Sequence, residues 1–256
     1  MRVRELTEAV VNKPKIEIVP DAQDLARRSL ELFIDSARKA IAAKGSFRVA
    51  ISGGQTPRRF FELLGESAGA KTLAWDKIYL FWVDERYVAP DSEQSNFKLA
   101  ADTFLGKVPI PQDNVYRIFT EYKDINLAAK EYEKIIRVVF NLKQNEVPQF
   151  DIVFLGLGTD GHIASLFPAS SAIFETQHLA AAIEDAKLAR ITLTSPVLCA
   201  AARIVILVSG EEKAGILKQV LTTEPDVKKY PVHLLWPVLD KVTWLTDAAA
   251  AKLLRS

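Results

Sequence analysis

The chain has 256 residues, with 33 basic side chains against 32 acidic ones and a formal net charge of +1. This length allows a substantial core, and the balanced charge gives no overall attraction to nucleic acid or a membrane surface. The single cysteine, Cys199, excludes an intrachain disulfide and a cysteine zinc cluster. We expect a cytoplasmic protein, because residues 1–20 lack the apolar segment of a signal peptide and no stretch approaches the ~20 apolar residues of a membrane span.

Apolar segments alternate with helical patterns along the chain, which predicts an α/β fold with a largely parallel sheet. In the first half, Asp21 is the predicted N-cap of a helix that ends at Gly45, and Thr56 is the predicted cap of a second helix. The patterns predict helices over 21–44, 57–64, 97–105 and 126–140, strands over 47–51 and 78–83, and a polar loop over 84–96. In the second half they predict strands over 152–155, 190–194, 203–208 and 242–245, and helices over 211–221 and 247–254.

Ligands in open α/β sheets bind beyond the carboxyl ends of the strands, so the loops that follow the strands are of most interest. The first is Ser52-Gly53-Gly54-Gln55-Thr56-Pro57, in which two glycines allow close backbone approach and the next helix offers free N–H groups. The residues favour anion binding, although a tight strand-to-helix turn needs the same glycines.

Two further segments that follow predicted strands carry charged residues. Asp84-Glu85-Arg86 follows six apolar residues; Arg86 is a candidate anion donor and Asp84 a carboxylate at the edge of the cleft, with a solvated loop as the alternative. Lys213 lies in the first turn of a predicted helix, where the helix dipole disfavours a cation. A bound anion would offset that cost, whereas the simpler interpretation is a surface lysine.

The stretch DIVFLGLGTDGHIASLFP, residues 151–168, contains G-x-G-x-x-G directly after an apolar segment. It does not fit a dinucleotide-binding turn, because Pro168 leaves no room for a full helix and no acidic residue clearly ends a following strand. His162 is the stronger candidate, since histidine both accepts and gives a proton near neutral pH and Asp160 is close enough to orient it. A structural loop histidine is the alternative.

Together the segments resemble the 6-phosphogluconolactonases of the glucosamine-6-phosphate deaminase/6-phosphogluconolactonase family. The resemblance runs from about residue 20 to the C-terminus and rests on ISGGQTP, VDERYV with SNFKLA, GLGTDGHIASLFP, RITLTSPVL and LVSGEEKA in the family's order. It implies one domain over residues 1–256, with a doubly wound, Rossmann-related α/β fold like that of glucosamine-6-phosphate deaminase. The implied reaction is hydrolysis of 6-phospho-D-glucono-1,5-lactone to 6-phosphogluconate, the second step of the oxidative pentose phosphate pathway.

The resemblance also implies roles for individual residues. His162 is the expected general base that activates water, and Asp160 belongs to the same motif. The expected substrate and phosphate contacts are Ser52, Gly53, Gly54, Asp84, Arg86, Lys213 and Arg190. No metal, organic cofactor or obligate protein partner is expected.

Two other functions stay open at this point. A glucosamine-6-phosphate deaminase would use the same phosphate contacts, with Asp84 as the base that transfers a proton. Ile163 matches the isoleucine in the G-H-I-A motif of the deaminases. The motif continues Ser165-Leu166-Phe167-Pro168, however, and lacks the deaminase glutamate, which favours the lactonase. A non-enzymatic sugar-phosphate regulator would need an effector or DNA-binding domain for which the chain has no basic extension.

Overall fold

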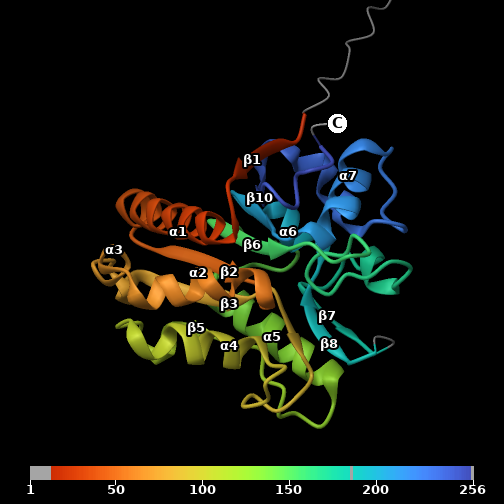
Figure 1. The fold of residues 1–256 in the computed structure, drawn as a ribbon. Helices are drawn as coiled ribbons and strands as arrows, with labels where there is room; N and C mark the ends of the chain where they lie inside the picture. The colour runs from red at the N-terminus through yellow and green to blue at the C-terminus, as the bar shows by residue number, and fades with distance from the viewer. Residues whose placement is uncertain (1–12, 185–186, 255–256) are drawn as a thin grey trace, which may run out of the picture.

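The computed structural model describes residues 13–184 and 187–254 and has a seven-stranded parallel sheet at its centre. The strand order β1-β10-β9-β6-β2-β3-β5 places the first half of the chain mainly on one side of β6 and the second half on the other (Figure 1). This doubly wound arrangement confirms the expected α/β class. The strands are β1 (Lys15–Val19), β2 (Phe47–Ile51), β3 (Ile78–Trp82), β5 (Val115–Tyr116), β6 (Ile152–Gly156), β9 (Ile204–Val208) and β10 (Val242–Asp247).

A second, three-stranded antiparallel sheet lies beside the large one. It has the order β4-β8-β7 and consists of β4 (Asp84–Arg86), β8 (Arg190–Leu193) and β7 (Ala180–Ile183). Residues 84–86 were predicted to begin a polar loop, and that prediction was wrong because β8 supplies a pairing partner from a distant part of the sequence.

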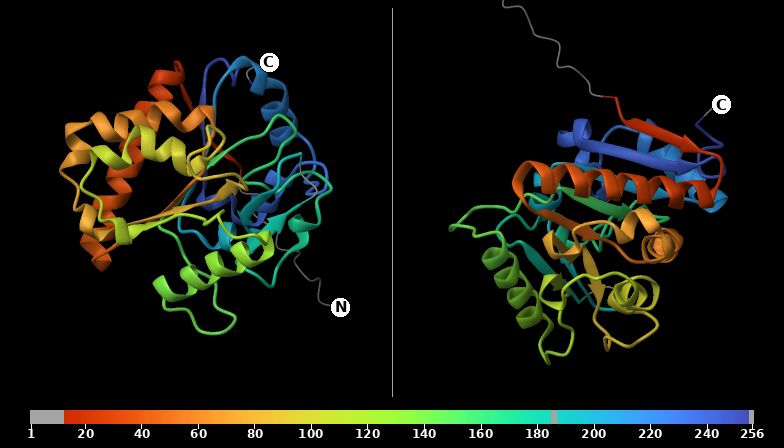
Figure 2. Two further views of the ribbon diagram at one scale, coloured as in Figure 1. Left: turned by 90° about the horizontal axis from the view of Figure 1, so that it is seen from below. Right: turned by 90° about the vertical axis from the view of Figure 1, so that its left-hand side faces the viewer.

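Helices cover both faces of the large sheet. Helices α1, α2 and α4 pack together on one face, and α5 packs against β7 and β8 on the other side (Figure 2). Asp21 caps α1 by accepting a hydrogen bond from the Asp24 amide at 2.8 Å, and Gly45 ends it with φ +74°, both as predicted. The helices are α1 (Ala22–Lys44), α2 (Gln55–Glu66), α3 (Ala68–Lys71), α4 (Asn96–Thr103), α5 (Ile125–Val139), α6 (Ser195–Ala200) and α7 (Ala214–Thr222).

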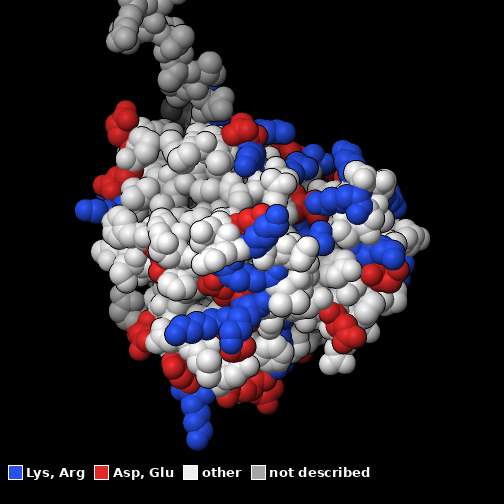
Figure 3. Space-filling view, turned by 180° about the vertical axis from the view of Figure 1, so that it is seen from behind, with Lys and Arg blue, Asp and Glu red and all other residues white. Residues whose placement is uncertain are grey.

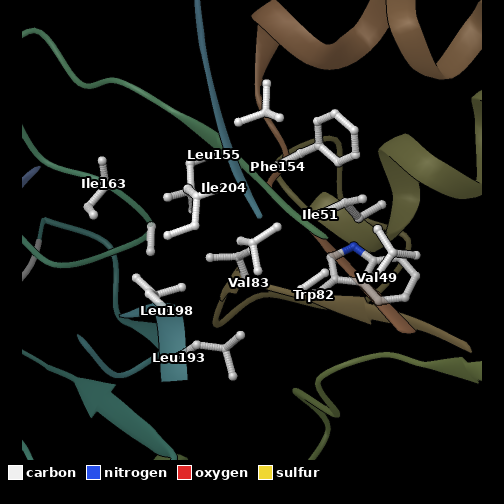
Figure 4. Close-up of a cluster of buried hydrophobic side chains, with 14 of the residues drawn as sticks. Val49, Ile51, Trp82, Val83, Phe154, Leu155, Ile163, Leu193, Leu198 and Ile204 are labelled. Carbon is white, nitrogen blue, oxygen red and sulfur yellow. The ribbon is translucent and has the colours of Figure 1, made fainter. Parts of the chain in front are cut away.

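Apolar side chains from both sheets form the core beneath the strand ends. Figure 4 shows Ile51, Trp82 and Phe154 of the large sheet near Leu193 of the small sheet and Leu198 of α6. Successive side chains of a strand point to opposite faces of the sheet, and both faces are covered, so the central strands are buried on both sides. This core holds the carboxyl ends of β2, β3, β6 and β9 at one edge of the sheet.

Other predictions at element ends were also wrong. Gly54, not Thr56, is the N-cap of α2, which starts two residues before the predicted position. Residues 248–254 form turns rather than a helix, because their backbone hydrogen bonds, from Ala251 N to the Asp247 carbonyl at 3.0 Å and from Leu254 N to the Ala251 carbonyl at 2.9 Å, are isolated and not consecutive. The expected absence of a signal peptide concerns mainly residues 1–12, which lie outside the described residues.

Among residues 13–184 and 187–254, no helix combines the length and the apolar character needed to cross a bilayer.

Candidate active site

A pocket of about 420 Å³ lies beyond the carboxyl ends of β2, β3, β6 and β9. It brings together seven of the nine predicted site residues, which come from β4 and from the loops that follow β2, β6 and β9. They are Ser52, Gly53, Gly54, Asp84, Arg86, His162 and Lys213. Ser52 and Lys213, which are 161 positions apart in the sequence, therefore meet here because parallel strands end at the same edge.

The Ser52–Gly54 loop presents the start of α2 to the pocket. Gly54 has φ +105°, a conformation that favours glycine, and as N-cap it gives no side-chain hydrogen bond to the first turn of α2. Gln55, Thr56 and Pro57 of that turn line the pocket as well. The positive end of a 12-residue helix is thus turned toward the cavity, an arrangement suited to a phosphate.

His162 is held by a tight turn after β6. Gly161 has φ +83°, and the Gly158 amide donates to the His162 carbonyl at 2.8 Å. A Cβ at position 158 would lie 2.1 Å from His162 Nδ1, so the ring occupies the space that glycine leaves. Gly158 and Gly161 therefore shape the backbone around a histidine.

Asp160 orients the His162 ring from behind. Its Oδ1 lies 2.6 Å from His162 Nδ1 and also accepts from the His162 amide at 3.2 Å. Burial acts to raise the pKa of the Asp160 carboxyl, but the hydrogen bonds and charge of His162 outweigh it and hold the pKa below its usual value. Because a carboxylate only accepts, Nδ1 carries the proton in this pair and a neutral ring keeps its lone pair on Nε2.

Lys213 reaches the same pocket from the loop after β9. It ends a short 3₁₀ turn, Glu211–Lys213, that precedes α7, and its Nζ donates to the Leu157 carbonyl at 2.7 Å. Burial lowers the pKa of the Lys213 ammonium, against the neighbouring Glu212 and Asp160 carboxylates, which raise it. The ammonium is thus a partly desolvated cation at the wall of the cavity.

Arg86 and Arg190 are directly opposite each other in the β4–β8 pair. Like charges in that position destabilise a sheet unless an anion lies between or beside them. The Asp84 carboxylate supplies part of the compensating negative charge. Its Oδ2 lies 4.0 Å from Arg190 Nη1 and accepts a hydrogen bond from Ser165 Oγ at 2.6 Å. Arg86 lines the pocket, whereas Arg190 lines a neighbouring depression with Phe167. The Phe167 ring contacts both the Arg190 guanidinium and the His162 ring, whose centroid lies 4.6 Å away. Burial lowers the pKa of the Arg190 guanidinium.

Two residues near the site received no predicted role. Glu85 is 2% exposed and accepts hydrogen bonds from the amides of Arg86, Asn96 and Phe97 and from Ser95 Oγ. Asn96 opens α4 and lines the pocket. The sequence did offer a signal, because polar residues at a helix start next to an apolar strand are often buried to satisfy backbone groups.

Basic and acidic side chains are nearly equal in number over the whole chain, 33 against 32. On the face drawn in Figure 3, several Lys and Arg side chains lie across the middle, with Asp and Glu side chains among and around them. Among the described residues, no three His, Cys, Asp or Glu side chains group in a way that could hold a metal ion. The cations of the pocket are thus local features, which suits a small anionic ligand better than a polyanion.

The chain is similar to known proteins over nearly its whole length. The family of glucosamine-6-phosphate isomerases/6-phosphogluconolactonase matches residues 20–244. The chain belongs to this family. A 6-phosphogluconolactonase of Nostoc sp. is 37% identical over 238 residues, which are 93% of this chain and 97% of the relative. One of Synechocystis sp. is 35% identical over 242 residues, covering 94% and 99% of the two chains.

Solved structures of family members have the same architecture. A 6-phosphogluconolactonase from Thermotoga maritima superimposes with a TM-score of 0.77 at 28% identity, covering 92% of this chain and 100% of the other. One from Trypanosoma brucei gives a TM-score of 0.82 at 26% identity, with 94% and 98% covered. A monomeric glucosamine-6-phosphate deaminase, at 19% identity and a TM-score of 0.79, shares the fold, with 93% and 99% covered. The family and fold expected from the motifs are therefore confirmed.

Proposed function

We propose that this protein is a 6-phosphogluconolactonase that hydrolyses 6-phospho-D-glucono-1,5-lactone to 6-phospho-D-gluconate, the second step of the oxidative pentose phosphate pathway. The observation that carries the proposal is the His162–Asp160 pair at 2.6 Å, facing a pocket that also contains a helix N-terminus and Lys213. The relatives that match nearly the whole chain bear that name. We place the enzyme in the cytoplasm, acting alone on a small sugar phosphate.

In the proposed mechanism His162 is the general base. Its Nε2 takes a proton from water while the water oxygen attacks the lactone carbonyl carbon, giving a tetrahedral oxyanion and a protonated imidazole. The bond from that carbon to the ring oxygen then breaks, and the ring oxygen takes the proton back as it becomes a hydroxyl. The Asp160 carboxylate orients the ring and stabilises the imidazolium. Water and protein side chains supply every group these steps use.

The phosphate contacts are assigned from charge and position. The first turn of α2 and the Ser52–Gly54 loop provide N–H and hydroxyl donors, and Lys213 and Arg86 provide the positive charge. Asp84 and Arg190 support this arrangement from the β4–β8 pair, with Asp84 at the pocket wall. Binding the phosphate here places the rest of the sugar in the same cavity as His162.

The test generates the lactone in situ with glucose-6-phosphate dehydrogenase and couples the product to 6-phosphogluconate dehydrogenase. Rates are compared for the wild type, for His162→Ala and for a blank, which is essential because the lactone also hydrolyses unaided. We expect acceleration by the wild type and a rate close to the blank for the variant. Wild-type protein that gives only the blank rate would overturn the proposal, and release of ammonia from glucosamine 6-phosphate would replace it with a deaminase.

A further inference from the structure

Phe167 contacts the ring of His162 from outside the active-site pocket. The centroids of the two rings lie 4.6 Å apart, and the ring planes are tilted by 55°. His162 lines the pocket, whereas Phe167 lines the neighbouring depression together with Arg190. Phe167 therefore touches the proposed general base without lining the cavity proposed for the substrate.

The hydrogen bond to Asp160 does not by itself fix the direction of the His162 ring. It holds one atom, Nδ1, at 2.6 Å from Asp160 Oδ1, and the χ2 torsion of a histidine has broad energy minima. The Gly158 backbone limits one edge of the ring, because a Cβ at that position would lie 2.1 Å from Nδ1 and 2.3 Å from Cε1. Contact with Phe167 adds a further restraint on the ring plane, and so on the direction in which Nε2 points.

A compact turn after His162 holds Phe167 in this place. The Leu166 amide donates to the Ile163 carbonyl at 2.9 Å, and the Ser170 amide donates to the Phe167 carbonyl at 3.1 Å. The side chains of Ile163 and Leu166 are fully buried and anchor the turn in the core. The chain is thereby reversed, so that an aromatic ring five positions after the histidine packs against it.

Arg190 lies against the same aromatic ring. Its guanidinium carbon, Cζ, is 5.4 Å from the centroid of Phe167, which is within the range of a cation–π contact. The Asp84 carboxylate, 4.0 Å from Arg190 Nη1, supplies a counter-charge from the pocket wall. Arg190 thus reaches His162 through Phe167, although the sequence led us to expect a direct contact with the substrate.

We propose that Phe167 and Arg190 are positioning residues: Phe167 holds the His162 ring at the angle at which Nε2 accepts the proton of the attacking water, and Arg190 acts through Phe167. The inference rests on the proposed function and adds the control of the base to it. A displacement of about 1 Å in an active site can lower the rate on the order of 10²-fold. Binding of the substrate depends less on the angle of this ring, so the pair controls kcat rather than KM.

The experiment measures kcat and KM of Phe167→Leu and Phe167→Tyr in the coupled lactone assay. Leucine keeps an apolar side chain and removes the ring, whereas tyrosine keeps the ring. We expect Phe167→Leu to lower kcat about 10- to 100-fold with KM changed less than about twofold, and Phe167→Tyr to restore most of the lost kcat. Wild-type kcat in folded Phe167→Leu would overturn the inference, and so would an equal loss in both variants.

Phe174→Leu is the matched control. Phe174 is 57% exposed, its ring centroid lies 5.9 Å from Lys228 Nζ, and it lines a different depression of the surface. It therefore shares with Phe167 an aromatic ring beside a cation, but among the described residues its ring makes no contact with His162. This variant should keep the wild-type kcat and KM. A loss of kcat equal to that of Phe167→Leu would contradict a role that depends on contact with the histidine.

A double-mutant cycle tests the role of Arg190. In the wild-type background, Arg190→Met should lower kcat about two- to fivefold, the size of an exposed cation–π contact. In the Phe167→Leu background the same change should lower kcat by a factor close to one, because the ring through which Arg190 acts is absent. Equal losses of kcat in both backgrounds would contradict action through Phe167. An equal rise of KM in both, with kcat unchanged, would assign Arg190 to direct contact with the substrate.

A second variant without the ring covers the case in which Phe167→Leu does not fold. Phe167→Met has an unbranched side chain that adapts to irregular space, and the same loss of kcat is expected of it. Wild-type protein that does not accelerate hydrolysis of the lactone would contradict the proposed function. Active wild type together with wild-type kcat in a folded variant that lacks the ring would contradict only the inference, so the two failures are distinguishable.

Discussion

His162 and Lys213 line the same pocket, but the chemistry predicts different kinetic effects for them. Replacing His162 by alanine removes the proposed proton acceptor, so kcat should fall by about 10²–10⁴ with little change in KM. Replacing Lys213 by alanine removes a charge-assisted contact to the phosphate that is worth roughly 1.5–3 kcal/mol, and KM should rise roughly 10- to 100-fold. Steady-state kinetics on both variants checks the assignment, and the opposite pattern would reverse the two roles.

The buried environment of Lys213 predicts a pH dependence of ligand binding. Burial lowers the pKa of this lysine from its ordinary 10.5, and only the protonated form attracts a phosphate. Affinity for 6-phosphogluconate should therefore weaken as pH rises. The weakening should begin at a lower pH than it would if Lys213 had the pKa of an ordinary lysine. Isothermal titration calorimetry between about pH 8 and 10 tests this, because the phosphate is already fully ionised there. Lys213→Arg keeps its charge and should lose most of this dependence; an equal slope in both proteins would assign it to another group.

At the scale of elements, Glu85 connects the start of α4 to β4. Its carboxylate accepts from three backbone amides and from Ser95 Oγ, so Glu85→Gln places an NH₂ group against N–H donors. We expect the free energy of unfolding to fall by about 1–3 kcal/mol, measured by urea denaturation. Exposed Glu93, between β4 and α4, provides the control, since Glu93→Gln should change stability little.

The Glu85 carboxylate also predicts how the stability difference between the wild type and Glu85→Gln changes with pH. Burial raises the pKa of Glu85 above its ordinary 4.5, although its hydrogen bonds act in the other direction. A raised acid pKa means that the folded state holds the proton more tightly, so the contribution of Glu85 declines as pH rises from 4.5 through the raised value. The free energy of unfolding of the wild type should therefore exceed that of Glu85→Gln by less as pH rises over that range. A difference that grows with pH would contradict the direction of the pKa shift.

Elements with strong local signals were predicted well, and those that depend on distant partners were not. Helix α1 has an Asp21 cap and a Gly45 end that act within a few residues, and β2 is a short buried apolar run, so local sequence sufficed. Strand β4 consists of charged residues whose burial and pairing come from β8, more than 100 positions later. Strand β5 has only two residues and β7 is alanine-rich, so both carry too little apolar periodicity to be recognised. Strand β1 does alternate polar and apolar residues, but it is short and only partly buried at the sheet edge, and it was not predicted.

At the scale of the whole molecule, the sequence could locate the site because of a general property of parallel sheets. Loops after β2, β6 and β9 end at one edge, which brings Ser52, His162 and Lys213 together although their order in the sheet was unknown. The division between Arg86 in the pocket and Arg190 in the neighbouring depression could not be predicted, because it depends on the antiparallel register of β4 and β8. A polar residue at a helix start indicated burial at Asn96, but its place in the pocket could not be predicted, because it depends on packing against Gly53, 43 positions earlier.

The last prediction concerns the single domain expected over residues 1–256. Buried side chains of both sheets belong to one hydrophobic cluster, with Trp82 of β3, Leu193 of β8 and Trp244 of β10 among its members. A shared core predicts that the two halves of the chain unfold together, so tryptophan fluorescence and far-UV circular dichroism should give coincident denaturation curves. Two double variants separate the reporters: Trp75→Phe with Trp82→Phe leaves only tryptophans of the second half, and Trp236→Phe with Trp244→Phe leaves only those of the first. Within each variant the two curves should still coincide. A fluorescence transition that precedes the loss of secondary structure in only one variant would divide the chain into two units.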